Sequence, residues 1–411
     1  MKKNAKNKIP AVKPVVKVEL SEKNKIIRIA LIAVLIAVGI GLIALSVSSF
    51  FGKDKGFTEI KAEDSEFGDL FSLYYDLGAS GASASAEHRR VKGVYTKALG
   101  KFCKLLSSST EYPGVKNIYY INSNTGKDIA IDPFLYEALS KMTEDGSSLL
   151  YLGPILERYA EVFACDSDAY AEHLDPTKNE VSRNLCLKAL EYSKDRSAVT
   201  LHLLGENTVR LDVSEEYAKF AAENGITRFI DLGVFENAFV VDAISEALIA
   251  EGMTLCSISS FDGYSRNLDE REKEYGFTVN AKYGDTVYPV CSASYRGKMT
   301  VISFRAYPTS RLDRLVSYFY SDGTSAHRFI DLESGICKSS IPELVAVSDD
   351  SGCASVALEA YEIYVGGKTI EESTSGVAVV WLDGRTVKST ARGLMLHSPY
   401  ADNEISFEIA D

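Results

Sequence analysis

The feature that most constrains the fold of this chain is an apolar run near its N-terminus. Residues 29–51, IALIAVLIAVGIGLIALSVSSFF, contain no charged residue. A helix of this length extends about 35 Å at 1.5 Å per residue, which is enough to cross a bilayer core of about 30 Å with some tilt. A cleaved signal peptide has a shorter apolar core, and a buried core helix is seldom apolar on every side. We therefore predict a transmembrane signal anchor.

The residues that flank this run predict its orientation. Nine Lys or Arg and two acidic residues precede it, and basic residues beside a membrane span stay on the cytoplasmic side. The predicted organisation is a basic cytoplasmic tail (1–28), a transmembrane signal anchor (29–51), a juxtamembrane linker (52–65) and an extracytoplasmic domain (66–411). The expected localisation is the cell membrane, as a single-pass protein with a cytoplasmic N-terminus.

The charge of the chain limits its partners. The net charge is −12 overall and +7 over residues 1–28, so the remainder carries −19. A domain this acidic is a poor ligand for the phosphate backbone, and we expect no nucleic-acid partner. The remaining part of about 350 residues is long enough for one large domain or two smaller ones.

The seven cysteines do not form a recognisable framework. They are scattered without a Cys-x-x-Cys pair or regular spacing, so neither a zinc site nor a disulfide scaffold is predicted. We expect most of them to act as small buried hydrophobic residues.

Hydrophobic periodicity predicts a mixture of helices and strands. The expected helices cover residues 86–106, 133–143, 154–165, 179–194, 214–224 and 240–251. The expected strands include residues 70–77, 118–121, 199–204, 228–232, 254–259, 287–295, 298–306, 344–348, 376–382 and 394–397. Helices mixed with many antiparallel strands indicate an α+β fold.

Three segments carry more specific patterns than the rest of the chain. They are EDGSSLLYLGP at 144–154, FIDLGVFENAFVVD at 229–242 and SAHRFIDLESG at 325–335. In this order and spacing they resemble the ApbE-type FAD:protein FMN transferases, over residues 66–367. The resemblance implies an ApbE-like domain that transfers FMN from FAD to a threonine of an exported partner protein, with magnesium.

The resemblance rests on matched positions in each segment. The first segment contributes Asp145, Gly146, Gly153 and Pro154, and the second contributes Asp231, Leu232, Gly233 and Asp242. A Gly-Gly-Asp turn of the family corresponds to Ser260-Phe261-Asp262, a Thr-Ser-Gly to Thr309-Ser310-Arg311, and a His-x-Ile-Asp-Pro-x-Thr-Gly to residues 328–335, which begin with Arg328. By this resemblance, the catalytic residues would be Asp331 and Asp262, and the cofactor-binding residues would be Asp231, Gly233, Asp242 and Thr309.

The departures from the family pattern fall on its reactive positions. An Ala-Lys-Gly-Tyr step is replaced around Asn237, Ala238 and Phe239. The two expected metal-ligand positions hold Cys353 and Ala357, which offer no hard oxygen to magnesium. Asp349 and Asp350 lie just before them and are candidate displaced ligands.

Two functions are therefore open. The chain is either an FMN transferase that uses FAD and magnesium, or a catalytically inactive binding or scaffolding subunit, without cofactor, at the outer membrane face or beside a membrane redox complex. Which of the two functions holds depends on the role of the site aspartates. Asp242 and Asp331 could bind a cofactor, but their positions are also suited to capping a helix or a turn.

Overall fold

The computed structural model describes residues 56–62, 64–144, 148–284, 286–370, 376–391, 394–397 and 407–410. They all belong to one compact unit, residues 55–411. The predicted tail and anchor lie outside the described residues. Within the described part, no helix is both long and apolar enough to cross a bilayer, so the anchor stays a prediction.

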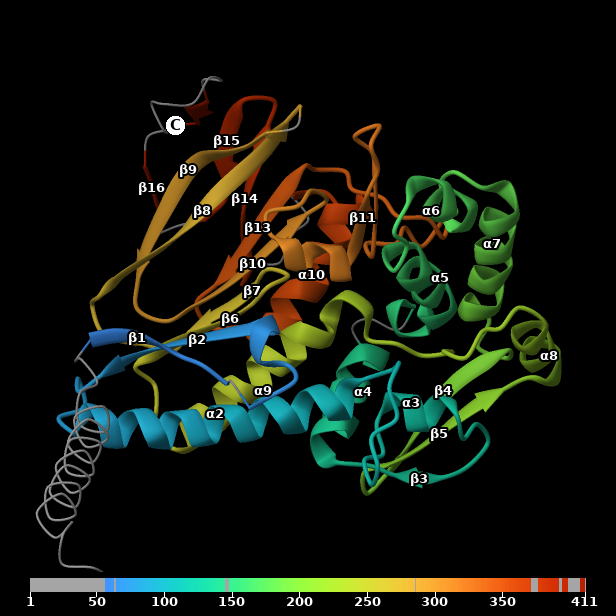
Figure 1. Ribbon diagram of the computed structural model, residues 1–411, viewed down its shortest axis with the longest axis horizontal. Helices are drawn as coiled ribbons and strands as arrows, with labels where there is room; N and C mark the ends of the chain where they lie inside the picture. The colour runs from blue at the N-terminus through green and yellow to red at the C-terminus, as the bar shows by residue number, and fades with distance from the viewer. Residues whose placement is uncertain are drawn as a thin grey trace, which may run out of the picture. The chain divides into compact units, whose positions relative to one another are not determined.

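The centre of the described unit is a nine-stranded sheet (Figure 1). Its neighbouring strands pair antiparallel, except for the parallel last pair. The order is β1 (Gly56–Ile60), β2 (Phe71–Leu77), β6 (Cys256–Ser260), β7 (Tyr264–Asn267), β10 (Met299–Arg305), β13 (Glu343–Ser348), β14 (Ala378–Asp383), β15 (Thr386–Ser389) and β17 (Glu408–Ile409).

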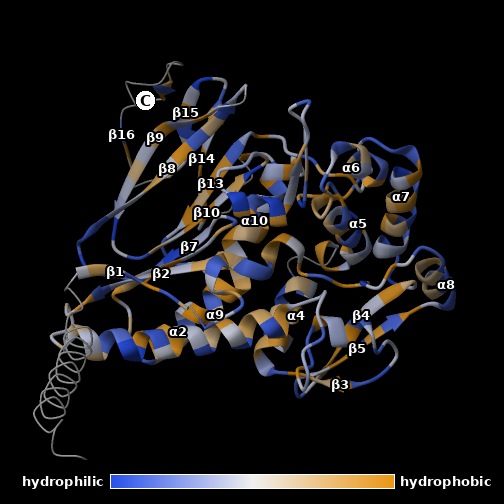
Figure 2. Ribbon diagram, in the orientation of Figure 1, coloured by the Kyte–Doolittle hydropathy of each residue, from blue (hydrophilic) through white to orange (hydrophobic). Residues whose placement is uncertain are grey.

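Three helices pack on one face of this sheet: α2 (Ala84–Leu106), α9 (Glu236–Ala250) and α10 (Cys353–Val365). Figure 2 shows that α9 and α10 are hydrophobic over most of their surface, as expected for helices buried between other elements. Helix α10 ends at Gly366, whose φ of 81° provides the left-handed residue that commonly terminates a helix.

A second, smaller sheet covers part of the opposite face. It has the order β16 (Met395–His397), β9 (Thr286–Arg296) and β8 (Glu274–Tyr283). Between the two sheets, β13 is buried on both sides: Leu344 and Ala346 join the core under the helices, and Val345 and Val347 join the core under β8 and β9. A strand that is buried on both faces has a continuous apolar sequence, as residues 344–347 do here.

The remaining elements lie between α2 and α9 in the sequence, or follow β10. They are α3 (Ile118–Asn122), β3 (Ile129–Ala130), α4 (Pro133–Glu144), α5 (Gly153–Phe163), α6 (Asp168–Leu174), α7 (Glu180–Lys194), β4 (Val199–Gly205), β5 (Thr208–Val213), α8 (Glu215–Glu223), β11 (Ser317–Phe319) and β12 (Ser325–His327). Strands β3, β5 and β4 form one small sheet, and β11 and β12 form another.

The mixed helix and sheet architecture agrees with the fold class expected from the sequence, but two predicted strands are wrong. Residues 118–121 lie in helix α3, because the Asn117 side chain accepts a hydrogen bond from the Tyr120 backbone N–H at 2.9 Å and starts a helix there. Residues 228–232 lie in no strand and pair with none. The Asn122 side chain takes that role, accepting from the N–H groups of Phe229 and Ile230 and donating to the Ile230 carbonyl.

Several elements were not predicted from the sequence, and β1 and α10 are two of them. Residues 56–60, placed in a juxtamembrane linker, form β1 at the edge of the main sheet. Helix α10 was missed because it is buried on nearly every side and therefore lacks an amphipathic period. All seven cysteines lie among the described residues, unpaired, and five of them are buried.

Candidate functional site

The fold brings together the first two of the segments that the sequence singled out. Gly153, at the start of α5, lies so close to the second segment that a Cβ at this position would be 2.5 Å from the Arg228 carbonyl oxygen. The Asp231 N–H donates to the Leu150 carbonyl at 2.9 Å. Asp145 and Gly146 lie outside the described residues.

Asp231 organises the turn that leads into α9. One carboxylate oxygen accepts from the Gly233 N–H at 2.7 Å, and the other accepts from the Ser108 hydroxyl at 2.6 Å. Gly233 has a φ of +58°, which favours glycine. Arg228 lies 3.7 Å from the same carboxylate. Both oxygens of Asp231 are therefore already used within the protein.

Asp262 lies in the tight turn between β6 and β7, and both of its carboxylate oxygens also accept hydrogen bonds within the protein. Its carboxylate accepts from the Ser260 hydroxyl at 2.6 Å and from the Asn237 amide at 2.9 Å. It also accepts from, and pairs with, the guanidinium of Arg328, whose side chain is 11% exposed. Arg328 belongs to the third segment, so an ion pair joins this segment to the turn between β6 and β7.

These residues form an acid–arginine cluster, which we define as Asp231, Glu236, Asp262, Arg228 and Arg328. Burial raises the pKa of Glu236 to about 8, and the negative charge of Asp231 adds to this effect. Asp231 and Asp262 raise the pKa of Glu236, whereas Arg328 and Arg228 lower it. The cluster thus places three acidic residues beside two arginines, and one of the three, Glu236, binds its proton more tightly than a free glutamate does.

Asp242 caps helix α10. Its two carboxylate oxygens accept from the backbone N–H groups of Cys353 at 2.8 Å and Ala354 at 2.9 Å, which are among the N–H groups that the first turn of a helix leaves unpaired. Arg266 lies 3.3 Å away. A Cβ on Gly352 would come within 2.8 Å of this carboxylate. Burial raises the pKa of Asp242, although the two N–H groups and Arg266 oppose that shift.

Asp331 and Thr309 each lie in a local turn. The Asp331 carboxylate accepts from the backbone N–H and the hydroxyl of Ser334, at 3.2 and 2.6 Å. Burial alone would raise the pKa of Asp331, but the Ser334 hydrogen bonds and Lys338 hold it below its ordinary value. Thr309 is exposed, and its N–H donates to Asp313 at 2.7 Å in the turn before β11.

The residues at the expected metal position do not fit magnesium. Burial raises the pKa of the Cys353 thiol well above its ordinary value, so the thiol stays neutral, and Ala357 offers no donor atom. The nearby Val234 carbonyl accepts a hydrogen bond from the buried Tyr264 hydroxyl. Hard oxygen ligands are therefore missing or already engaged where the ion would need them.

Asp349 and Asp350, the candidate displaced ligands, are both exposed. Asp350 accepts from the hydroxyls of Ser348 and Ser351, at 2.9 and 3.1 Å. Both aspartates line a surface recess that they share with Arg266 and Lys298. Among the described residues, no group of three or more His, Cys, Asp or Glu side chains is arranged to hold a metal ion.

The surroundings of Asp262 do not fit a flavin either. The cavity beside Asp262 and Arg328 has a volume of about 20 Å³ and is also lined by Arg305, Tyr307 and Phe329, whereas pockets that bind small molecules usually measure about 300–1,000 Å³.

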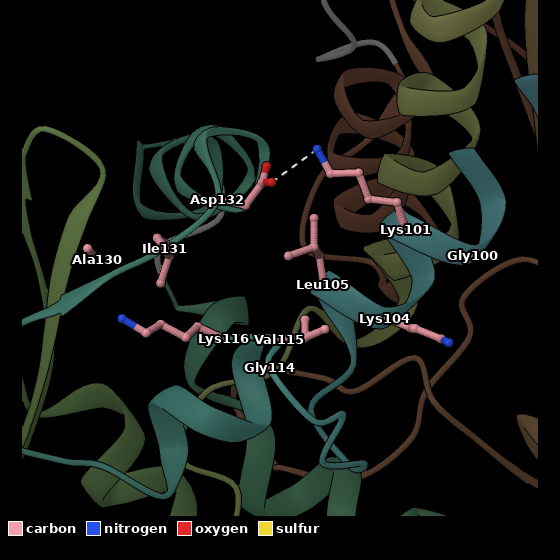
Figure 3. Close-up of a pocket in the computed structure, with 10 residues that line it drawn as sticks. All are labelled: Gly100, Lys101, Lys104, Leu105, Gly114, Val115, Lys116, Ala130, Ile131 and Asp132. Carbon is pink, nitrogen blue, oxygen red and sulfur yellow. Dashed lines mark ion pairs between the residues drawn. The ribbon is translucent and has the colours of Figure 1, made fainter. Parts of the chain in front are cut away.

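A larger recess of about 430 Å³ lies elsewhere, between the end of α2 and the segment that leads into α4 (Figure 3). Lys101 and Asp132 form an ion pair there at 3.0 Å. The residues that line this recess belong to none of the three segments.

The raised pKa of Glu236 predicts a dependence of stability on pH. The folded protein keeps this proton up to about pH 8, whereas the unfolded chain loses it near the ordinary value of 4.5. Between these two values the folded state binds more protons, so the free energy of unfolding falls as pH rises, and it levels off above pH 8.

The substitution Glu236→Gln is expected to remove this contribution, because the amide does not ionise. Urea denaturation at several pH values between 5 and 8 measures it. The exposed Glu223→Gln is the matched control and should leave the slope unchanged. An unchanged slope in Glu236→Gln would contradict the assignment.

Sequence reasoning located Asp231, Asp262 and Asn237 but missed the roles of three residues that shape the site. Arg328 was noted only as the first residue of the stretch 328–335, and its ion pair with Asp262 was not predicted. Glu236 was missed, and its signal is its place beside Asn237 at the start of α9. Nothing in the sequence indicated that the Tyr264 hydroxyl would bond to the Val234 carbonyl.

Comparison with known proteins supports the fold. No protein-family model and no curated protein matches the sequence. The crystal structure of the ApbE protein from Thermotoga maritima matches with a TM-score of 0.54 and 13% identity, over 79% of this chain and 94% of that one. The flavin transferase ApbE from Vibrio cholerae matches with a TM-score of 0.47 and 10% identity, over 80% and 93%. The match to the Thermotoga maritima protein shows that the chain has a divergent ApbE-like fold.

Proposed function

We propose that this chain is a membrane-anchored, extracytoplasmic ApbE-like protein that does not transfer FMN and acts as a binding or scaffolding subunit at the outer face of the membrane. The fold is the starting point. The location rests on the apolar run 29–51 and the basic residues before it.

The observation that carries this proposal is the ion pair between Asp262 and Arg328. It occupies the turn that corresponds to the Gly-Gly-Asp turn of the family, and it neutralises the aspartate with a buried guanidinium. An aspartate paired in this way is not available as a metal ligand or a base. Its other carboxylate oxygen is also satisfied, by Ser260.

The surrounding residues support the same conclusion. The Val234 carbonyl bonds to Tyr264, the Asp242 carboxylate caps α10, and the metal-ligand positions hold Cys353 and Ala357. Phosphoryl transfer depends on charge neutralisation by a metal ion. A protein whose polar groups are mutually satisfied at this position keeps the fold and loses the chemistry.

A transfer assay tests the proposal. The purified full chain is incubated with FAD, magnesium and a threonine-containing acceptor peptide, and covalent flavin on the peptide is measured by fluorescence and mass. We expect no labelled peptide, with a flavin transferase ApbE as the positive control. Flavin attached to the acceptor by this chain would show that the proposal is wrong.

A further inference from the structure

An exposed aromatic patch lies at the edge of the main sheet. We define the aromatic patch as Phe57, Tyr74, Tyr275 and Lys273. Phe57 and Tyr74 are 41% and 40% exposed, and their rings are stacked at 6.0 Å with an interplanar angle of 9°. Tyr275, from β8, packs on Phe57 at the same centroid distance. Large aromatic rings left exposed side by side point to a binding surface.

A lysine completes the patch. The ammonium group of Lys273 lies 4.7 Å from the centre of the Phe57 ring and 5.9 Å from that of Tyr275. It also pairs with Asp76 at 3.4 Å. The patch thus combines apolar ring faces, a phenol hydroxyl and a cation on a flexible stem, without a large net charge.

The register of the strands places the patch on the sheet face opposite α2. In β2, Tyr75 points toward α2, where its hydroxyl donates to Glu87, so its neighbour Tyr74 points to the other side. Tyr74 pairs with Glu59 and Phe57 pairs with Asp76, so both rings share that side. The start of β8 lies near the same part of the sheet (Figure 1).

The covalent chain limits how far this patch can be from the predicted anchor. Four residues, 52–55, separate Phe51 from Gly56. Even fully extended, this connection spans no more than about 18 Å. The first described strand therefore begins within that distance of the end of the apolar run, and Phe57 is its second residue.

From these observations we propose that the aromatic patch inserts into the lipid headgroup region of the membrane that holds the anchor, and so orients the domain on the bilayer surface. The inference rests on the proposed function, because it requires the anchor. Tyrosine rings are favoured at the interface of a bilayer, and a lysine can bury its stem while its ammonium reaches the headgroups. Because Asp76 pairs with Lys273, the patch should not require anionic lipid.

Depth-dependent fluorescence tests this inference. The full chain, carrying Phe57→Trp, is reconstituted into phosphatidylcholine vesicles with or without a lipid nitroxide quencher near the headgroup. The signal of the parent, whose single tryptophan is Trp381, is subtracted. We expect a blue-shifted emission and quenching several-fold stronger than for Tyr170→Trp, a matched control at a 70% exposed site on α6. Adding Tyr74→Glu should reduce the quenching.

A second reporter guards against a folding defect. If circular dichroism shows that Phe57→Trp is misfolded, Tyr74→Trp reports on the same patch. Vesicle flotation tests the anchor separately from the insertion of the aromatic patch. A chain that floats while both reporters stay unquenched and unshifted overturns the inference and leaves the anchor standing. A chain that does not float overturns both.

Discussion

Replacing Asp262 with alanine is expected to destabilise the protein by about 3–5 kcal/mol, because it leaves the buried guanidinium of Arg328 without its partner. The carboxylate also accepts from Ser260 and Asn237, whose polar groups would lose a partner as well. Urea denaturation of the purified chain, followed by circular dichroism, measures the change in the free energy of unfolding.

Two controls define what this result means. The exposed pair of Lys388 and Asp383 is the matched surface case, and Asp383→Ala should cost less than about 1 kcal/mol. The double variant Asp262→Leu with Arg328→Met removes both charges and should recover much of the loss, because well-packed apolar residues often replace a buried pair without cost. An Asp262→Ala protein as stable as the parent would show that the ion pair does not hold the turn.

The second large effect is expected at Gly263, which follows Asp262 in the turn. Gly263 has a φ of +105°, and a Cβ there would lie 2.2 Å from the Ser303 carbonyl oxygen of the neighbouring strand. The substitution Gly263→Ala therefore combines backbone strain of about 1–3 kcal/mol with displacement of a packed strand, which typically costs about 1–3 kcal/mol more.

Gly297 supplies the matched control for this substitution. Its φ is +77°, but no atom lies within 4 Å of the position of its Cβ. Gly297→Ala should therefore show only the strain, and Gly263→Ala should be the more destabilised of the two in thermal and urea unfolding. Equal losses in the two variants would contradict the close packing of the turn against β10.

The elements that could be predicted from the sequence are those with a clear hydrophobic period. Helix α2 and strand β2 were predicted because one face of each is apolar and the other is not. Helix α10 was missed because it is buried nearly all round, and residues 228–232 were wrongly predicted as a strand because the Asn122 side chain, not a neighbouring strand, bonds to their backbone. Neither kind of environment leaves a period in the sequence.

The candidate site was predictable in its parts but not in its connections. The resemblance suggested Asp231, Asp262 and Asp331 as site residues, and it placed Cys353 and Ala357 at the positions where metal ligands were expected. Which group neutralises Asp262 depends on a contact between residues 66 positions apart. The alternative role of Asp242 as a helix cap was raised from the sequence, and the structure shows its carboxylate on the first N–H groups of α10.

The scaffolding role and the anchor stay proposals, and the two are consistent with each other. The chain keeps an ApbE-like fold and an apolar run long enough to cross a membrane, while the groups that would hold a metal and a flavin are engaged with one another. An extracytoplasmic domain of this kind would act through what it binds and where it is held.

The central claim is that the acid–arginine cluster has replaced a flavin site. Equilibrium titration of FAD with the full chain, in the presence of magnesium and followed by flavin fluorescence, tests it most directly. We predict that the fluorescence stays unchanged across the micromolar range, for the parent and for Glu223→Gln alike. Saturable quenching in that range, abolished by Asp262→Ala in a chain that remains folded, would contradict the account.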